Sequence, residues 1–225
     1  MGRPREHGPQ TQLALLDAAE ALVARGGVEA LSVRALAEEI GSSVRAVYSV
    51  FGSKEGLIRG LAVRGFELLM EEVDSVPITA DPTADLAGAA IKGFRPFALG
   101  HPDLFRLVFV ESRIDLGPGA GQASANAFGR LAARLERARE AGVVPDRPID
   151  ELGLEFHALC QGLASVELCG LVSKPQAGKM WTDSLKDLLA GWQGAATAPR
   201  RRAARPGPQT RAARPSRRPA APGVS

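Results

Sequence analysis

Residues Ser32–Leu57 read SVRALAEEIGSSVRAVYSVFGSKEGL and hold two short helical patterns on either side of a glycine. Ser32 is a favourable N-cap because its hydroxyl can accept a hydrogen bond from an amide of the first helical turn. Gly41 interrupts the first pattern where a tight turn needs a residue that adopts positive φ without steric cost. The sequence therefore predicts a short helix between Ser32 and Gly41, with apolar residues at helical spacing: Val33, Leu36, Ala37 and Ile40.

The second pattern follows the turn directly. Ser42 and Ser43 can both cap a helix over 44–51, whose inward residues would be Val47 and Phe51. Two short helices joined by a three- or four-residue turn are typical of the helix-turn-helix, whose second helix enters the DNA major groove. On spacing alone, an ordinary helical hairpin fits this stretch equally well.

The identities of the residues in this stretch resemble the DNA-binding domain of TetR-family transcription regulators. The resemblance begins in a preceding helix over 11–25 and the bend over 26–31. It implies an all-α fold, with an N-terminal three-helix helix-turn-helix domain joined by a long helix to a C-terminal helical dimerisation and ligand-binding domain, about nine helices in all. The matching residues, in the family's order, are Ala37, Gly41, Ser43, Val47, Tyr48, Phe51, Lys54, Glu55 and Leu57.

The second helix exposes side chains suited to base recognition if Val47 and Phe51 face inward. Arg45 is the only one that can make the bidentate contact to guanine that is common in major-groove recognition. Small apolar side chains can meet thymine methyl groups, and serine hydroxyls can reach bases or phosphates. A solvated Arg45 without a role is the alternative. The predicted reading residues are Ser42, Ser43, Val44, Arg45, Ala46 and Ser49.

Three further residues are predicted to contact the DNA backbone. Tyr48 matches a family tyrosine that contacts phosphate, and Arg34 lies early in the preceding helix. Lys54 follows Ser53, an N-cap by residue type, so its charge and the free amides of that helix would both favour a phosphate. A surface lysine without a role is the alternative for Lys54.

The pattern also departs from the family. A branched hydrophobe commonly stands at the position of Ser42, and a basic or small polar residue at that of Val44. These departures leave the predicted fold unchanged, but they prevent prediction of the operator by analogy.

Charge is distributed unevenly along the chain. Residues 199–225 contain eight of the 28 basic side chains and none of the 25 acidic ones, so residues 1–198 have a net charge of −5. We expect a flexible basic arm over 1–10 and a disordered tail rich in Arg, Pro and Ala over 195–225. Both segments could add salt-sensitive contacts to DNA, and for both a solvated segment without a role is the alternative.

No apolar run reaches the length of about 18 residues that a membrane-spanning helix needs, and no secretory signal precedes the first helix. The prediction is a cytoplasmic, nucleoid-associated protein without contact to a membrane. Cys160 and Cys169 fall on opposite sides of a helix, so they are predicted not to pair with each other.

Beyond the predicted DNA-binding domain, 11–57, the apolar spacing continues as a ligand-binding and dimerisation domain over 58–194. A long helix is expected to about Val73, where it would link the two domains. Further helices are expected over 81–99 and 103–111, followed by a loop over 116–121. A helix over 122–141 completes this part, with Phe128, Leu131 and Leu135 on one side and Arg130, Arg134, Arg137 and Glu140 largely on the other.

Two final helices, 150–171 and 176–192, are predicted to form a homodimer interface. The first is apolar nearly all round and rich in small residues, as expected of a helix buried on more than one side. It resembles the penultimate helix of TetR regulators with a Trp-His-Gly signature, although the corresponding residues here are Phe156, Gln161 and Gly162. A monomer that packs its last helix on its own core is the alternative.

Aromatic and polar residues of the second domain could line a pocket for a small hydrophobic or aromatic effector, although the same residues would also suit a packed helical core. No HExxH, GxSxG or CxxC motif occurs, and His7, His101 and His157 lie far apart, so we predict neither an enzyme nor a metal site or cofactor. The candidate pocket residues are Phe94, Phe97, His101, Phe105, Phe109, Phe128, Phe156, His157 and Gln161.

The function predicted from the sequence is that of a homodimeric repressor. It would bind double-stranded DNA at a palindromic operator and leave it when a small effector binds. The alternative is a constitutive architectural DNA-binding protein without an effector, whose affinity comes mainly from the basic tail.

Overall fold

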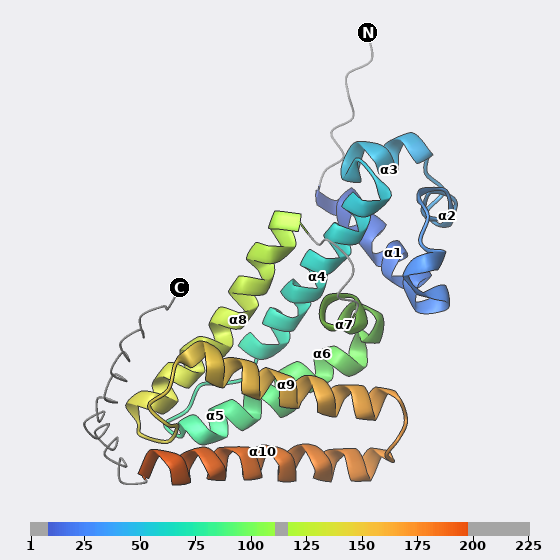
Figure 1. The fold of residues 1–225 in the computed structure, drawn as a ribbon. Coiled ribbons are helices and arrows are strands. Elements are labelled where there is room, and N and C mark those ends of the chain that lie inside the picture. Colours follow the sequence, from blue (N-terminus) through green and yellow to red (C-terminus); the bar gives the residue numbers. More distant parts are fainter. Residues whose placement is uncertain (1–8, 111–116, 198–225) are drawn as a thin grey trace, which may run out of the picture.

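The computed structural model describes residues 9–110 and 117–197, and within them every regular element is a helix. The predicted arm and tail lie outside the described residues, apart from Pro9 and Gln10 in the first helix and residues 195–197 in the last. Figure 1 shows the first three helices at one end of the molecule and the last two at the other. The elements at the first end are α1 (Pro9–Ala30), α2 (Val33–Glu39) and α3 (Val44–Phe51).

The cap residues place the first three helices. Oγ of Ser32 accepts a hydrogen bond from the amide of Ala35 at 3.1 Å, and Oγ of Ser43 accepts one from Ala46 at 3.2 Å. Between α2 and α3, Gly41 takes a φ of 61°, which a residue with a side chain rarely adopts. The predicted pair of short helices and their turn are thus confirmed, with Ser43 as the cap of α3.

The first helix is longer than the predicted 11–25, but it breaks at the predicted place. Gly26 and Gly27 have non-helical backbone angles inside α1, and Gly27 has a φ of 71°. The chain then resumes one helical turn before Ala30. Leu31, which is fully buried, follows this turn and anchors it on the core of the domain.

A long helix, α4 (Lys54–Asp74), leads from this domain into the rest of the molecule. It starts inside the predicted DNA-binding domain, three residues before its expected boundary at 57, and crosses that boundary without a break. At 21 residues it spans about 31 Å. α8 (Gly117–Glu140) lies along it, and these two helices form the frame of the second domain (Figure 1).

The predicted helix over 81–99 is a continuous helix of three parts. It comprises α5 (Pro82–Gly88), the π-helical turn η1 (Ala89–Phe94) and α6 (Arg95–Gly100), and Asp81 caps its start. A Cβ at Gly93 would lie 2.9 Å from the Cα of Val73, so a glycine is needed there for η1 to approach α4 so closely. α7 (Pro102–Phe109) follows, which confirms a helix rather than a strand for this apolar segment.

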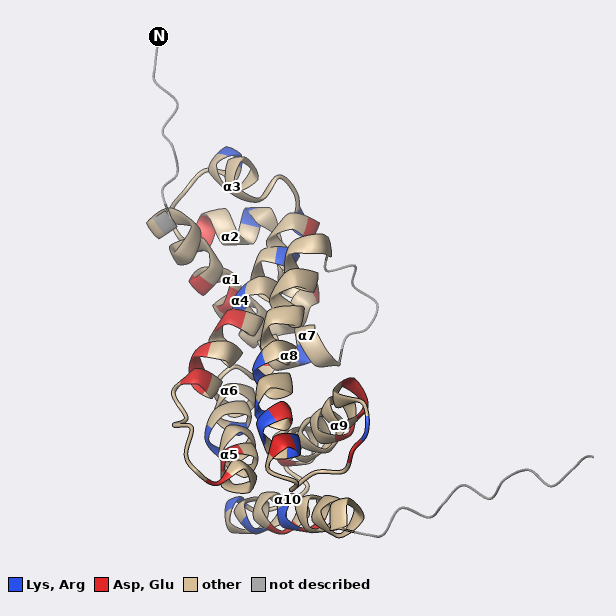
Figure 2. Cartoon of the chain, turned by 90° about the vertical axis from the view of Figure 1, so that its left-hand side faces the viewer, with Lys and Arg blue, Asp and Glu red and all other residues tan. Residues whose placement is uncertain are grey.

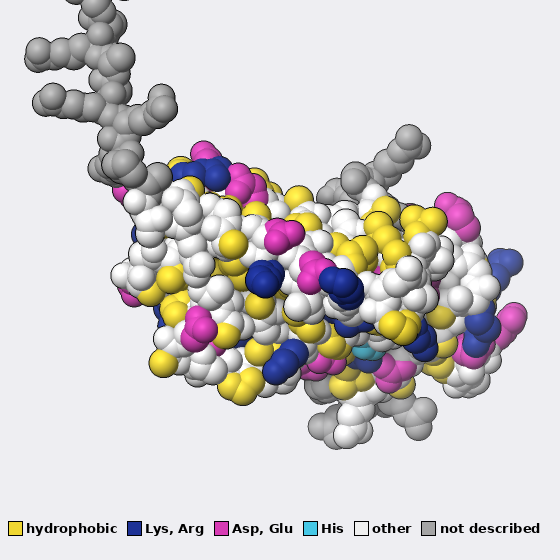
Figure 3. Space-filling view, turned by 90° about the horizontal axis from the view of Figure 1, so that it is seen from below, with side chains coloured by type: hydrophobic (Ala, Val, Ile, Leu, Met, Phe, Trp, Pro, Cys, Tyr) yellow, Lys and Arg dark blue, Asp and Glu magenta, His cyan; other side chains and the backbone are white. Residues whose placement is uncertain are grey.

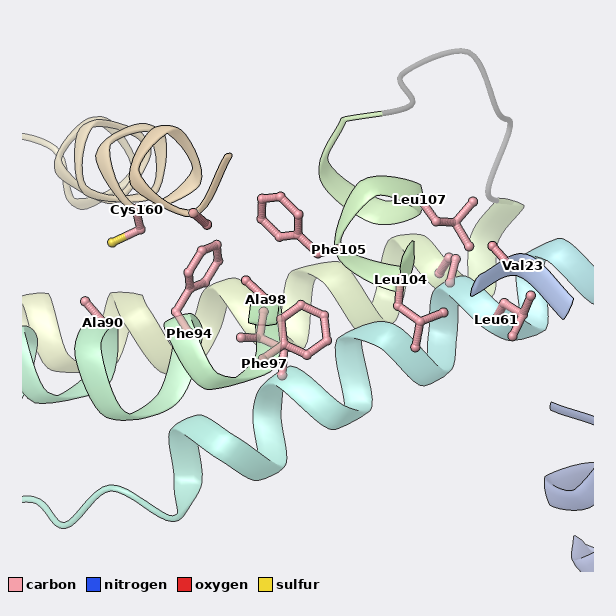
Figure 4. Packing of buried hydrophobic residues seen from close by; sticks show 14 of the residues in the cluster. Val23, Leu61, Ala90, Phe94, Phe97, Ala98, Leu104, Phe105, Leu107 and Cys160 are labelled. Atoms are coloured by element: carbon pink, nitrogen blue, oxygen red, sulfur yellow. The ribbon is translucent and has the colours of Figure 1, made fainter. Parts of the chain in front are cut away.

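The interior between these helices is filled by aromatic and aliphatic side chains. Figure 4 shows Phe94 pointing from η1 toward Cys160, and Leu104 of α7 lying near Leu61 of α4. Phe97 and Leu104 are fully buried, so they serve as packing residues of the core. The core continues without a break from α1 to α10.

One predicted loop is wrong in its described part. Residues 117–121 form the first turns of α8, where a loop was expected because of their glycines. Ala120 is 1% exposed and Ala123 is 7% exposed, so the start of α8 packs against the rest of the molecule. Burial here outweighs the low helix propensity of glycine, which costs only about 1 kcal/mol per residue.

The last two helices are α9 (Ile149–Leu168) and α10 (Lys174–Thr197). Glu167 of α9 joins them to the core, because it pairs with Arg95 of α6 at 2.8 Å and accepts a hydrogen bond from Nε1 of Trp181 at 2.9 Å. Cys160 is buried and Cys169 is exposed, and both are free thiols, as predicted.

The overall architecture agrees with the predicted all-α fold. If α5, η1 and α6 count as one helix, the described part of the chain has nine helices and no strand. None of these helices combines the length and hydropathy that crossing a lipid bilayer requires.

Candidate DNA-binding surface and ligand cavity

The outer face of α3 carries the predicted reading residues. Val47 is fully buried and holds the helix on the domain core, whereas Tyr48 is 49% exposed and Val44 is 37% exposed. Arg45 is exposed as well, and Ala46 is half-buried. The remaining members of the set, Ser42, Ser43 and Ser49, are exposed, although Oγ of Ser43 already accepts the capping bond and Oγ of Ser49 donates to the carbonyl of Ala46.

Most arginines of the described ranges pair with a carboxylate, but the two arginines of α2 and α3 do not. Arg34 and Arg45 are exposed, and neither forms an ion pair with another residue of the described ranges. By contrast, Arg25 pairs with Glu39 at 2.8 Å and Arg64 with Asp17 at 2.5 Å. Figure 2 shows basic positions on α2 and α3 at the far end of the molecule from α10. Unpaired guanidinium groups there are available to phosphates and bases.

The start of α4 modifies the expectation for Lys54. Ser53 caps this helix by accepting a hydrogen bond from the amide of Gly56 at 3.0 Å, as predicted. Hydrogen bonds from its own backbone amide and from Ser53 lower the pKa of Glu55, so this carboxylate already occupies the first turn. A phosphate beside half-buried Lys54 would therefore be attracted by the lysine charge more than by the helix end.

The second candidate site is a cavity of about 220 Å³ lined by residues of α4, η1, α7, α8 and α9. It is larger than an engineered cavity of about 150 Å³ that binds benzene. Its wall is mostly apolar, with a few polar groups, as in small-molecule sites generally. The wall comprises Phe66, Leu69, Met70, Val73, Ala89, Ala90, Phe94, Val108, Phe109, Ser124, Ala127, Phe128, Arg130, Leu131, Arg134, Phe156, His157 and Cys160.

Five of the nine predicted pocket residues line this cavity: Phe94, Phe109, Phe128, Phe156 and His157. The ring of His157 is the centre of this group, with its centroid 4.9 Å from that of Phe109 and 5.7 Å from that of Phe94. Burial lowers the pKa of His157, only partly offset by a hydrogen bond with Gln161, so this imidazole is neutral at pH 7.

The other four predicted residues lie outside the cavity wall. Phe97 and Phe105 are almost fully buried and fill the core. Nε2 of Gln161 donates to the carbonyl oxygen of Phe109 at 2.8 Å, which holds α9 to the end of α7. His101 stacks on Phe97 and faces Glu20 of α1, so it belongs to the contact between the two domains.

Several cavity residues were missed because they belong to helices interpreted as a connector or as a charged face. Phe66, Leu69 and Met70 come from α4, and their spacing shows only an apolar stripe. Arg134 was expected on the polar side of its helix, yet it is 5% exposed. A signal was present, because Leu131, Arg134, Leu135 and Ala138 follow the i, i+3, i+4, i+7 spacing of a buried helix face.

No three His, Cys, Asp or Glu side chains in the described ranges are grouped so that they could hold a metal ion.

Comparison with protein-family models gives two matches that together cover most of the chain. Residues 15–61 match the model of bacterial regulatory proteins of the tetR family, which covers α2, α3 and the start of α4. Residues 87–189 match a tetracyclin repressor-like C-terminal domain, which includes every helix of the cavity wall except α4.

Among curated proteins, the chain is similar to the HTH-type nicotine-responsive transcriptional repressor HdnoR of Paenarthrobacter nicotinovorans. The two are 37% identical over 76 residues, which is 34% of this chain and 38% of that repressor. The similarity therefore spans well under half of either protein.

Solved structures show the same fold over most of the chain. A protein of unknown function from Rhodococcus sp. RHA1 superposes with a TM-score of 0.71 at 23% identity, covering 85% of this chain and all of that one. The TetR family transcriptional regulator PfmR from Thermus thermophilus superposes with a TM-score of 0.60 at 22% identity, covering 78% of this chain and 97% of that one. FadR from Bacillus subtilis, in complex with stearoyl-CoA, superposes with a TM-score of 0.66 at 15% identity, covering 80% of this chain and 98% of that one.

The two family models, the confirmed helix-turn-helix and the shared fold agree with one another. Members of this family act as transcription regulators rather than as enzymes. The chain belongs to the TetR family of DNA-binding transcription regulators.

Proposed function

We propose that this protein is a homodimeric repressor that leaves a palindromic operator when a small hydrophobic or aromatic effector binds in the cavity. The observation that supports this most directly is the position of α4. Its first residue, Lys54, follows the recognition helix α3 by three positions, and its last turns contribute Met70 and Val73 to the cavity wall. One rigid helix thus connects the DNA-binding surface to the cavity.

The mechanism follows from the geometry of two half-sites. The recognition helices of a dimer must lie about 34 Å apart to enter successive major grooves on one side of DNA. An effector packed against Phe66 and Met70 would favour a different tilt of α4 and hence a different spacing of the two α3 helices. Release requires that the effector bind this second arrangement more tightly than the DNA-binding one.

The proposed dimer forms through α9 and α10. Leu154 and Leu171 are 60% and 74% exposed in and just after α9, and they are among the most exposed large apolar side chains in the described ranges. Figure 3 shows the face at the α10 end, where apolar side chains lie among charged ones of both signs. A twofold axis through these helices would give two symmetric copies of the DNA-binding surface.

On the DNA, Arg45 would read guanine and Val44 and Ala46 would contact thymine methyl groups. Phosphates would be held by Arg34, Tyr48 and Lys54. The serine hydroxyls of α3 and its turn would reach bases or phosphates. Named ligands of similar proteins agree with a hydrophobic effector, since HdnoR is nicotine-responsive and the FadR structure contains stearoyl-CoA. We place the protein in the cytoplasm, at the nucleoid.

A test measures operator release by the full-length protein, using fluorescence anisotropy of labelled DNA and a panel of hydrophobic and aromatic compounds. Ala127 lines the cavity from α8, so Ala127→Phe should fill it and abolish release while DNA binding persists. Ala125 is exposed on the same helix, outside the wall, so Ala125→Phe is a matched control that should respond as the wild type does. An Ala127→Phe variant that still releases DNA normally would contradict the proposal.

A further inference from the structure

One polar side chain in the cavity wall is buried without a full set of partners. Arg134 of α8 is 5% exposed. Its Nη2 donates to the carbonyl oxygens of Val73 at 3.0 Å and Val76 at 3.4 Å. Its Nε–H is buried and has no hydrogen-bond partner among the described residues. A buried donor without an acceptor is rare in proteins, because the lost hydration is not replaced.

The neighbouring arginines on α8 differ from Arg134 in this respect. Arg130, one turn earlier, pairs with Asp74 at 3.2 Å, and Arg137, one turn later, pairs with Asp85 at 2.7 Å. Arg134 itself has no carboxylate within ion-pair distance among the described residues. Burial lowers the pKa of Arg134, and the charges of Asp74 and Asp85 offset this effect only in part. A guanidinium stays charged in proteins, so its charge is incompletely balanced.

The rest of the cavity wall suits the apolar part of a molecule. Phe94, Phe109 and Phe128 surround the neutral ring of His157, and the described lining contains no aspartate or glutamate. Ser124 lies ten residues before Arg134 on α8, which places the two about 15 Å apart along the cavity. The wall therefore has apolar surface along its length and, toward one end, Arg134 together with Arg130, whose charge Asp74 balances.

We propose that the effector is a hydrophobic carboxylate, held by a charge-assisted hydrogen bond from the guanidinium of Arg134 while its apolar part lies among the phenylalanines. This proposal rests on the cavity being the effector site. An aromatic and an aliphatic carboxylate share the chemistry that Arg134 recognises, because an oxygen anion supplies both the missing acceptor and the missing charge. The test below distinguishes an aromatic from an aliphatic apolar part.

The same contact would couple the ligand to the DNA-binding domain. Arg134 already holds the carbonyl oxygens at the C-terminal end of α4. A carboxylate that binds this guanidinium would fix its position, and with it the end of the helix α4, whose other end adjoins α3. The anchoring group and the moving helix are thus in direct contact.

The experiment measures binding of four compounds to the full-length protein by calorimetry: phenylacetate, its neutral isostere phenylacetamide, octanoate and octanamide. At least one acid should bind ten times or more tighter than its own amide. Arg134→Met should lose this preference while the affinity for the amide changes less than threefold. Arg139 is exposed on the same helix, so Arg139→Met is a matched control that should keep the preference.

Equal affinity of acid and amide in the wild type would overturn the assignment, as would a preference that survives in Arg134→Met, or no binding of any of the four. If circular dichroism shows that Arg134→Met does not fold, the comparison of acid with amide in the wild type alone tests the assignment. Operator release is measured separately. An acid that binds through Arg134 without releasing DNA supports the site and contradicts the proposed regulatory function.

Discussion

Nδ1 of His101 lies 2.6 Å from Oε1 of Glu20, and this contact joins the start of α7 to α1. Glu20 also lies 3.5 Å from Nε of Arg64, whose Nη2 hydrogen-bonds Asp17 at 2.5 Å. The residues of this cluster therefore come from α1, from α4 and from the α6–α7 connection. It links the DNA-binding domain to the C-terminal part of the molecule beside α4, where a change in the tilt of α4 would have to act.

We expect Glu20 and His101 to stabilise the protein jointly. In a double-mutant cycle with Glu20→Gln and His101→Ala, the coupling free energy should be on the order of 1 kcal/mol, because both side chains are largely buried. Urea denaturation of the four proteins measures it. A coupling indistinguishable from zero would mean that the contact contributes nothing to the association of the two domains.

The second prediction concerns the backbone conformation of Gly41, which disfavours any residue with a side chain. Its φ of 61° is unfavourable for a residue with a Cβ, so Gly41→Ala should lower the free energy of unfolding by about 1–2 kcal/mol and weaken DNA binding by displacing α3. Gly129, exposed in the middle of α8 with open space around it, is the control. Gly129→Ala should be neutral or stabilise by about 0.5–1 kcal/mol. Equal effects of both substitutions would contradict the account of the turn.

The buried carboxylate of Asp85 predicts a dependence of stability on pH. Asp85 is 2% exposed and accepts hydrogen bonds from Nη1 of Arg137 at 2.7 Å and from the amide of Thr79 at 2.9 Å. Burial alone would raise the pKa of Asp85, but the hydrogen bonds from Arg137 and Thr79 outweigh it and hold the pKa below its usual value of 3.8. Because the pKa is depressed in the folded state, the ionised group stabilises the fold above about pH 3.8.

This contribution is lost as the pH falls through the lower folded-state pKa. Asp85→Asn should therefore lower the free energy of unfolding at pH 7 by about 1–3 kcal/mol. The difference from the wild type should shrink below about pH 3.8. Asp183→Asn, which breaks only an exposed pair with Lys179, should leave the free energy of unfolding almost unchanged. Denaturation curves at several pH values test both, and a difference for Asp85→Asn that stays constant down to about pH 2 would contradict the assignment.

The proposed dimer predicts a separation between assembly and folding. Leu154→Glu places a charge on the exposed face of α9, so it should shift the protein to monomers in sedimentation analysis and weaken operator binding at least tenfold. Leu99 is 40% exposed in α6, which is not one of the two proposed interface helices, and Leu99→Glu should leave the dimer intact. If Leu154→Glu remains a dimer, the interface lies elsewhere on the molecule.

Local chemistry made the DNA-binding domain predictable from the sequence. The caps at Ser32, Ser43 and Ser53 and the positive φ of Gly41 depend on neighbours a few residues away, and each is found in the structure. The same holds for Asp81, whose cap opens α5. Such features need no knowledge of how helices pack.

The cavity depends on packing, and here prediction from the sequence was incomplete. Phe97 and Phe109 are both phenylalanines, twelve positions apart, yet Phe97 fills the core and Phe109 lines the cavity. His101 meets a partner 81 residues away. Arg134 is buried because α8 packs against the end of α4, and residue type alone indicated the opposite. These outcomes are set by contacts between helices distant in sequence.

The central claim is that α3 reads a specific operator, and Arg45 tests it most directly. In-vitro selection of genomic DNA fragments compares the full-length protein with three variants: Arg45→Ala, Arg25→Ala as an exposed arginine already paired with Glu39, and one with the tail arginines replaced by glutamine. We predict a palindromic site that persists in Arg25→Ala and in the tail variant. Arg45→Ala should lose about 1–3 kcal/mol of binding free energy for this site and relax the base preference at one position in each half-site. If no motif emerges and only proteins with the intact tail retain DNA, the tail is the DNA-binding element and the claim is wrong.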